Sequence, residues 1–92
     1  MKIIVINGKE INNSEQLHDV LKSKFAFPEF YGNNLDALWD CLTGHVELPI
    51  KLIWKNFLIS KRILGEYAQL TLQVFIDASD MFGEDISVEI IP

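Results

Sequence analysis

Three short apolar segments, at residues 3–6, 49–54 and 85–91, alternate along the chain with longer segments of helical spacing. The first is a continuous β-branched run, which is typical of a strand covered on both faces in a parallel sheet. Helical connections between successive strands indicate parallel pairing with right-handed crossovers. We therefore expect an α/β fold in which a three-stranded parallel sheet packs with helices.

Two helices are expected between the first and second strands. The first begins with Asn13 or Ser14 as its cap and ends before Pro28, whose ring disfavours helical geometry in the preceding residue. The second spans residues 35–44, with Asn33 or Asn34 as its cap, and Gly44 ends it.

Two further helices are expected before the last strand. A short helix follows Asn56, which can cap it, and ends before Gly65. Residues 66–79 include the run LTLQVFI, which has strand propensity. The length of this region and the absence of an internal breaker favour a helix. The predicted order is therefore strand, two helices, strand, two helices, strand.

Length and composition indicate one domain covering residues 1–92. Hydrophobic residues make up 49% of the chain, which suits a globular protein with a modest core. The net charge is −5 at pH 7. Because binding to phosphate requires a basic face, free nucleic acid is a poor partner. A cationic protein is a better one, since opposite charge speeds encounter.

The single cysteine, Cys41, has no partner for an internal disulfide and no zinc-motif spacing around it. It indicates a reducing compartment. The N-terminal apolar run is too short for a signal peptide, and no stretch is long enough to span a membrane. We therefore expect a cytoplasmic protein that does not interact with membranes.

Two acids, Asp36 and Asp40, lie one turn apart on the expected helix at 35–44, with Trp39 beside them. Like charges at this spacing destabilise a helix by about 0.2–0.5 kcal/mol. Taken alone, such a pair is usually a solvated helix face. Paired carboxylates also occur in glycosidases, but two acids on one helix do not flank a substrate groove. No nucleophile–base pair accompanies them, so a small enzyme is the weakest hypothesis.

Other candidate side chains are expected to have ordinary structural roles. Cys41, His45 and Glu47 are close enough in sequence to suggest a metal site, but Cys41 falls on the inward face of its helix and is expected to be a buried thiol. We expect His18 at the surface or boundary of the first helix, and Trp54 in the core. No metal, cofactor or catalytic residue is therefore expected.

The segment FPEFYGNNLDALWDCLTGHVELP, at residues 27–49, closely resembles the barstar family, the intracellular inhibitors of barnase-type ribonucleases. Further matches are VINGKEI at 5–11, SEQLHDVLK at 14–22 and LQVF at 72–75 with an acid after it. The match runs along most of the chain, and its central run is too long to arise by chance. The resemblance implies a barstar-like α/β fold and a function without catalysis.

Barstar-like proteins cover the basic active site of a ribonuclease with the acidic helix and the loop before it, so that acids replace RNA phosphate. The resemblance implies that Asp40 is the central acid, Asp36 the second and Asp77 a further acid on a later helix. Phe30 stands where the family has tyrosine and His45 where it has tryptophan, which leaves the cognate enzyme open. The implied partner-binding residues are Phe30, Gly32, Asn34, Leu35, Asp36, Trp39, Asp40, Thr43, Gly44, His45 and Asp77.

The expected partner is therefore a basic, secreted, barnase-like ribonuclease, bound one-to-one by a protein that is monomeric when free. An alternative keeps the fold but makes the protein an immunity or binding module against a different basic toxin. Inhibition of barnase-like enzymes separates the two hypotheses.

Overall fold

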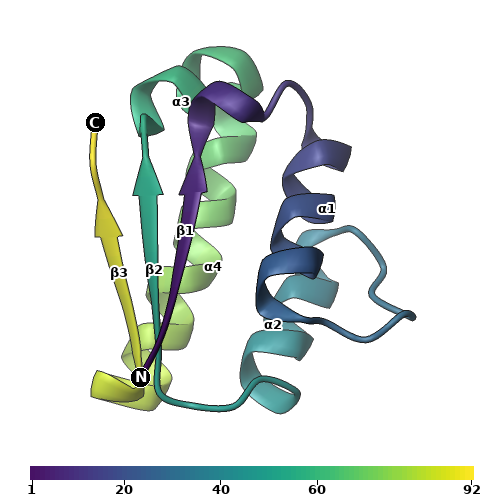
Figure 1. The fold of residues 1–92 in the computed structure, drawn as a ribbon, viewed down its shortest axis with the longest axis vertical. Helices are drawn as coiled ribbons and strands as arrows, with labels where there is room; N and C mark the ends of the chain where they lie inside the picture. Colours follow the sequence, from purple (N-terminus) through teal and green to yellow (C-terminus); the bar gives the residue numbers. More distant parts are fainter.

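A computed structural model describes residues 1–92 and contains one three-stranded sheet. The strands β1 (Lys2–Asn7), β2 (Ile50–Lys55) and β3 (Ile86–Ile90) lie in the order β1-β2-β3, with both pairs parallel (Figure 1). Leu52 on the central strand pairs with Ile4 on one side and Val88 on the other. The expected three-stranded parallel sheet is confirmed.

Two helical regions connect the strands, as the sequence predicts. The fourth helix runs to residue 82, three residues beyond its expected end, because no breaker precedes Gly83. Short 3₁₀ turns follow β1 and precede β3. The elements are η1 (Gly8–Glu10), α1 (Ser14–Phe25), α2 (Leu35–Gly44), α3 (Phe57–Leu64), α4 (Glu66–Phe82) and η2 (Gly83–Asp85).

Asparagine side chains cap the first two long helices. The Asn13 side chain accepts a hydrogen bond from the backbone amide of Gln16 at the start of α1. The cap of α2 is described with the site below. Asn56 precedes α3 but makes no capping bond, which corrects the expected role. Its backbone is left-handed, and its side-chain Nδ2 donates instead to Asn7 Oδ1 at 2.8 Å.

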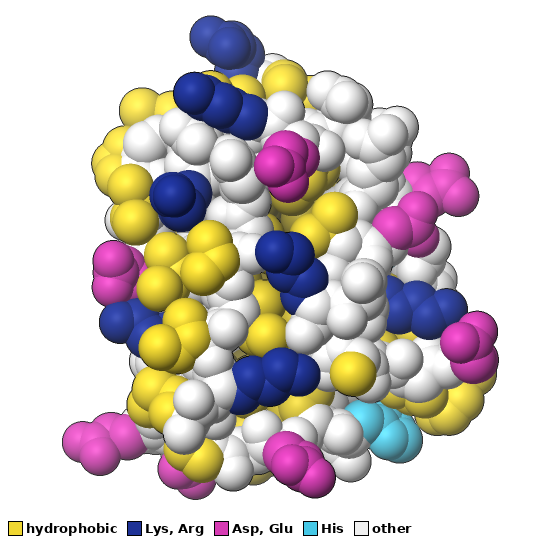
Figure 2. Space-filling view, in the orientation of Figure 1, with side chains coloured by type: hydrophobic (Ala, Val, Ile, Leu, Met, Phe, Trp, Pro, Cys, Tyr) yellow, Lys and Arg dark blue, Asp and Glu magenta, His cyan; other side chains and the backbone are white.

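The helices cover only one face of the sheet, so the expectation that β1 is buried on both faces is wrong. Ile4 and Ile6 are buried, whereas Ile3 is 57% exposed and Val5 is also exposed. Two right-handed crossovers that step in the same direction across a sheet place their helices on the same side. Figure 2 shows hydrophobic and basic side chains over the open sheet face.

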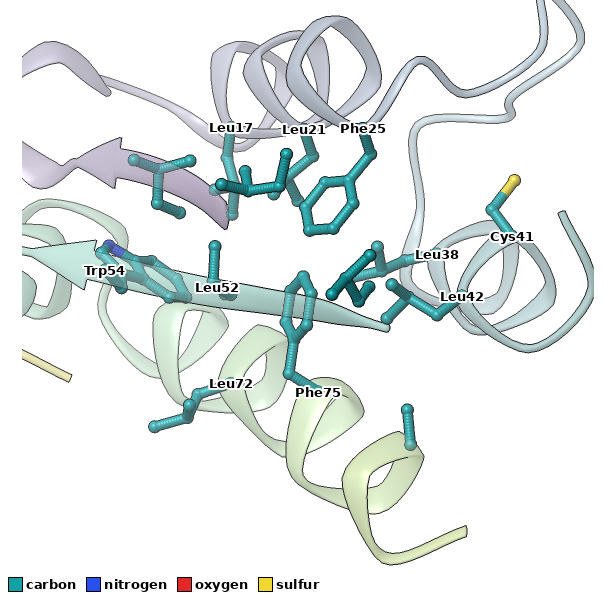
Figure 3. Packing of buried hydrophobic residues seen from close by; sticks show 14 of the residues in the cluster. Leu17, Leu21, Phe25, Leu38, Cys41, Leu42, Leu52, Trp54, Leu72 and Phe75 are labelled. Atoms are coloured by element: carbon teal, nitrogen blue, oxygen red, sulfur yellow. The ribbon is translucent and has the colours of Figure 1, made fainter. Parts of the chain in front are cut away.

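The core lies between the sheet and the helices. The buried hydrophobic side chains form one cluster, to which β2 contributes Leu52 and Trp54, α1 contributes Leu21, and α4 contributes Phe75 (Figure 3). Trp54 is fully buried and donates from Nε1 to Ser60 Oγ at 3.0 Å, so its expected core position is confirmed. No helix combines the length and the apolar character needed to cross a membrane.

Candidate protein-binding site

A pocket of about 360 Å³ opens between α2 and the loop that precedes it. This acidic pocket brings together six of the residues expected to bind a partner: Phe30, Gly32, Asn34, Asp36, Asp40 and His45. The other three lining residues, Tyr31, Ala37 and Cys41, are not among the partner-binding residues that the resemblance implied. The loop and the helix therefore form one concave surface.

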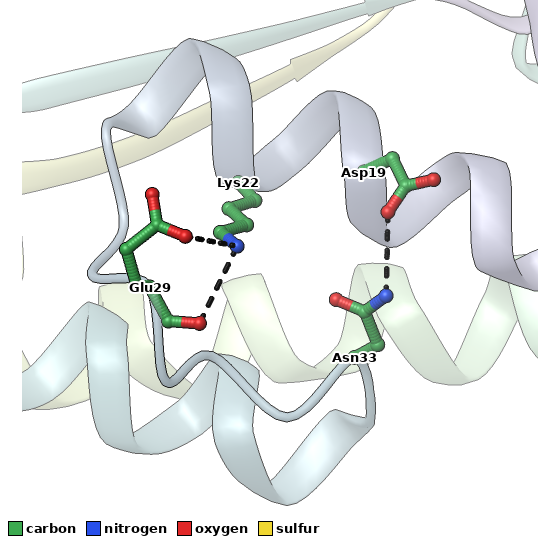
Figure 4. A network of polar contacts seen from close by, with 4 residues as sticks. All are labelled: Asp19, Lys22, Glu29 and Asn33. Atoms are coloured by element: carbon green, nitrogen blue, oxygen red, sulfur yellow. Dashed lines mark hydrogen bonds and ion pairs between the residues drawn. The ribbon is translucent and has the colours of Figure 1, made fainter.

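Helix α1 holds the loop in place at two points (Figure 4). Lys22 Nζ donates to the Glu29 carbonyl oxygen at 3.4 Å and lies 3.7 Å from its carboxylate. Asn33, whose backbone is left-handed, donates from its side-chain amide to Asp19 Oδ1 at 3.3 Å. Because the side chains of Glu29, Asn33 and Asp19 are exposed, water competes for these contacts and each contributes little stability. Their main effect is to orient the loop.

The start of α2 is fixed by Asn34. Its Oδ1 accepts from the Ala37 amide at 2.7 Å, while its Nδ2 donates to the Gly32 carbonyl oxygen at 3.3 Å. The first bond caps the helix and the second ties the cap to the loop. The Asn34 side chain therefore fixes the position of the loop relative to α2, the two parts of the chain that form the acidic pocket.

Asp36 and Asp40 are both exposed and line the same pocket. Neither carboxylate makes a hydrogen bond or an ion pair within the chain, whose two ion pairs are Lys22–Glu29 and Lys51–Glu89. No basic residue lies in the last turn of α2. The acidic pocket therefore presents negative charge that the protein itself does not neutralise.

Aromatic rings form the rim of the pocket. Phe30 is 73% exposed and meets His45 edge-on, with ring centroids 5.6 Å apart and planes at 73°. Beneath them Tyr31 is buried, and its ring lies 4.8 Å from that of Phe27. An exposed aromatic side chain beside unpaired acids is suited to a protein partner, because aromatic residues are enriched at interface centres.

Cys41 lies at the inner side of the pocket and is buried, as expected. Burial, and to a lesser extent the negative charge of Asp40, raise the pKa of the Cys41 thiol. The thiol therefore stays protonated near neutral pH, which suits packing rather than nucleophilic chemistry. No three His, Cys, Asp or Glu side chains cluster closely enough to hold a metal ion.

Five of the expected partner-binding residues lie outside the pocket. Trp39 and Leu35 are half-buried against the core, and Thr43 donates to the Trp39 carbonyl oxygen at 2.8 Å. Gly44 is exposed at the end of α2. Asp77 is exposed on α4, where it accepts a hydrogen bond from Gln73 at 2.8 Å. Asp77 therefore does not line the acidic pocket.

His18 is buried, with 1% of its surface exposed, so the expected surface or boundary position is wrong. Its two ring nitrogens pair with the hydroxyl groups of Tyr31 and Tyr67, each at 2.6 Å. Tyr67 lies on α4, far from His18 in the sequence. No local pattern could have identified this contact, because it depends on how α1, the loop and α4 pack.

Comparison with known proteins identifies the family of this chain. A family profile described as "Barstar (barnase inhibitor)" matches residues 1–90. The chain belongs to the barstar family. A Bacillus subtilis (strain 168) protein named "Putative ribonuclease inhibitor YrdF" is 48% identical over 88 residues, covering 96% of this chain and 97% of its own. The family resemblance found in the sequence is confirmed, and membership of the barstar family places the protein among ribonuclease inhibitors.

Proposed function

We propose that this protein blocks the basic active site of a barnase-like secreted ribonuclease with α2 and the loop before it. The observation that carries the proposal is the pair Asp36 and Asp40, exposed in one pocket and without any cation of their own. A ribonuclease must present cations to RNA phosphate. Carboxylates held by a rigid helix can occupy the same positions.

The whole-chain charge supports this partner. A net charge of −5 favours encounter with a basic protein, and barnase–barstar is itself the standard example of such electrostatic steering. In the proposal, the remaining residues implied by the resemblance, including Asp77 on α4, extend the contact beyond the pocket. One inhibitor binds one enzyme in the cytoplasm and protects the cell that produces it.

The decisive experiment is titration of the protein against a panel of barnase-like ribonucleases at low and high salt. We expect stoichiometric inhibition of at least one enzyme, with slower association at high salt because exposed charges are screened. Inhibition of none would overturn the proposal and favour the alternative, a module that binds a different basic toxin.

Asp40→Ala tests the role of the central acid. We expect inhibition to weaken by about 2–5 kcal/mol, a range known for charged pairs in complexes that include barnase–barstar. The thermal midpoint should hold or rise slightly, because the substitution removes a like-charge contact worth about 0.2–0.5 kcal/mol. The measurements are the inhibition constant and a thermal unfolding curve.

Glu66→Gln is the matched control, since it also removes one exposed negative charge but lies at the first residue of α4, outside the acidic pocket. It should change inhibition little. If both variants weaken inhibition equally, net charge rather than the acidic pocket is responsible. If Asp40→Ala unfolds the protein while the remaining folded fraction keeps its affinity, the assignment of Asp40 to binding is wrong.

A further inference from the structure

His18 is the one buried polar side chain of α1, and both of its ring nitrogens are occupied. Nδ1 lies 2.6 Å from Tyr31 Oη, and Nε2 lies 2.6 Å from Tyr67 Oη. The imidazole therefore joins three separate parts of the fold: α1, the loop before α2, and α4. No buried side-chain nitrogen or oxygen in the molecule lacks a hydrogen-bond partner.

The three side chains form an uncharged chain of hydrogen bonds. Burial lowers the pKa of His18, although nearby Asp19 opposes the shift, and burial raises the pKa of Tyr31 and Tyr67. A neutral imidazole has one N–H and one lone pair, so one tyrosine accepts from the ring and the other donates to it. Breaking either bond would leave a buried polar atom without a partner. The network therefore favours a single arrangement.

Tyr31 carries this constraint to the acidic pocket. Tyr31 is one of the residues that line the pocket, and its backbone amide donates to the Pro28 carbonyl oxygen at 3.0 Å. The residues on either side of it, Phe30 and Gly32, line the same pocket. The position of the Tyr31 hydroxyl therefore influences the direction in which both neighbours face.

We propose that His18 is a positioning residue for the binding surface, which clamps the loop at Tyr31 to α4 at Tyr67 and so presents the acidic pocket in one conformation before a partner arrives. The proposal rests on the proposed function, because it concerns the surface assigned to the ribonuclease. Preorganisation of this kind strengthens binding without a new contact, since the loop need not be ordered during association.

Tyr67→Phe tests the proposal, because it removes one hydroxyl from the network at a residue outside the acidic pocket. If the fraction of molecules with the loop in place falls to between about a third and a tenth, the inhibition constant rises about 3- to 10-fold. The inhibition constant is measured against the ribonuclease that wild type inhibits most strongly. Hydrogen exchange of the free protein should also become faster at the Tyr31 amide.

Ser60→Ala is the matched control, since it removes a buried hydroxyl that accepts from Trp54 Nε1 and does not line the pocket. We expect it to lower the thermal midpoint and leave both loop exchange and the inhibition constant unchanged. The proposal is overturned if Tyr67→Phe leaves exchange at Tyr31 unchanged, or speeds exchange equally in every element. Hydrogen exchange requires no ribonuclease, so this outcome is distinct from a failure of the proposed function.

Discussion

Asp36 and Asp40 point the same way from α2, but their own helix favours them unequally. Asp36 lies in the first turn, where the positive end of the helix dipole stabilises a carboxylate. Asp40 lies one turn further along, beyond the reach of that effect, and faces Asp36. A cationic partner would relieve the repulsion between them, which is why we assign the larger share of binding to Asp40.

A substitution at Gly44 can distinguish an effect on folding stability from an effect on binding at the proposed interface. A Cβ atom there would meet no atom within 4 Å, so we expect Gly44→Ala to leave the protein as stable or more stable by up to about 1 kcal/mol. An added methyl group on the contact surface should nevertheless weaken inhibition. The thermal midpoint and the inhibition constant are measured together.

Gly65→Ala should have the opposite effects, with lower stability and unchanged inhibition. Gly65 has φ of 61°, which strains any residue with a side chain, so this substitution should destabilise the fold by about 1–3 kcal/mol. Because Gly65 lies outside the pocket, inhibition by the folded protein should be unchanged. Unaltered inhibition by Gly44→Ala would remove that glycine from the interface.

At the scale of an element, the stability of α2 depends on its N-terminal cap, because its two acids destabilise the helix. The like-charge pair disfavours the helix, whereas Asn34 stabilises its first turn and also bonds to the loop. The same side chain thus stabilises the helix and shapes the pocket.

Removal of this cap should therefore have two effects. Asn34→Ala should destabilise the protein by about 1 kcal/mol and weaken inhibition as well. Asn13→Ala, which removes the cap of α1, should lower stability by a similar amount without a comparable loss of inhibition. Denaturant unfolding and inhibition assays measure the two effects. Equal loss of inhibition in both variants would show that stability alone limits binding.

At the scale of the whole molecule, the loop before α2 is held by contacts with helices α1 and α4. The loop is attached to α1 through exposed contacts and to α1 and α4 through the buried His18 network. The exposed contacts are weak because water competes for them. The buried network therefore adds polar links to the hydrophobic packing of Phe27 and Tyr31, which also attaches the loop to the core.

This network should make global stability depend on pH. Burial lowers the pKa of His18 in the folded state, whereas in the unfolded chain a histidine titrates near a pKa of about 6.5. Below about pH 6.5 the unfolded state therefore binds more protons than the folded state. The free energy of unfolding has its full value above that pH and falls as the pH decreases. The slope is at most about 1.4 kcal/mol per pH unit.

Urea unfolding between about pH 7.5 and about pH 5, above the range in which most carboxylates titrate, measures the effect. His18→Gln, which retains one donor and one acceptor, should show a flatter profile than wild type. Asp19 is the charged group beside His18 and opposes the shift, so Asp19→Asn should steepen the wild-type slope. Parallel profiles for wild type and His18→Gln would assign the acid sensitivity to other groups.

Much of the fold was predictable, because its signals are local. Strands and helices follow from residue type and spacing, as does the burial of Trp54, and the caps of α1 and α2 were narrowed to two residues each, of which the structure selects Asn13 and Asn34. The errors arose where packing decides. The β-branched run of β1 has the same sequence whether one face or both are covered, and Asn56 adopts a left-handed backbone that no short pattern indicated.

The same division holds at the site. The sequence by itself determined the acidic pair on α2, its aromatic neighbours and the family, because these are properties of contiguous residues. Only the tertiary structure decided that Phe30 meets His45 over the pocket, that Asp77 does not line it, and that His18 is buried between two tyrosines. Those facts depend on the relative placement of α1, α2 and α4, which is set by burial of a shared core rather than by any local preference.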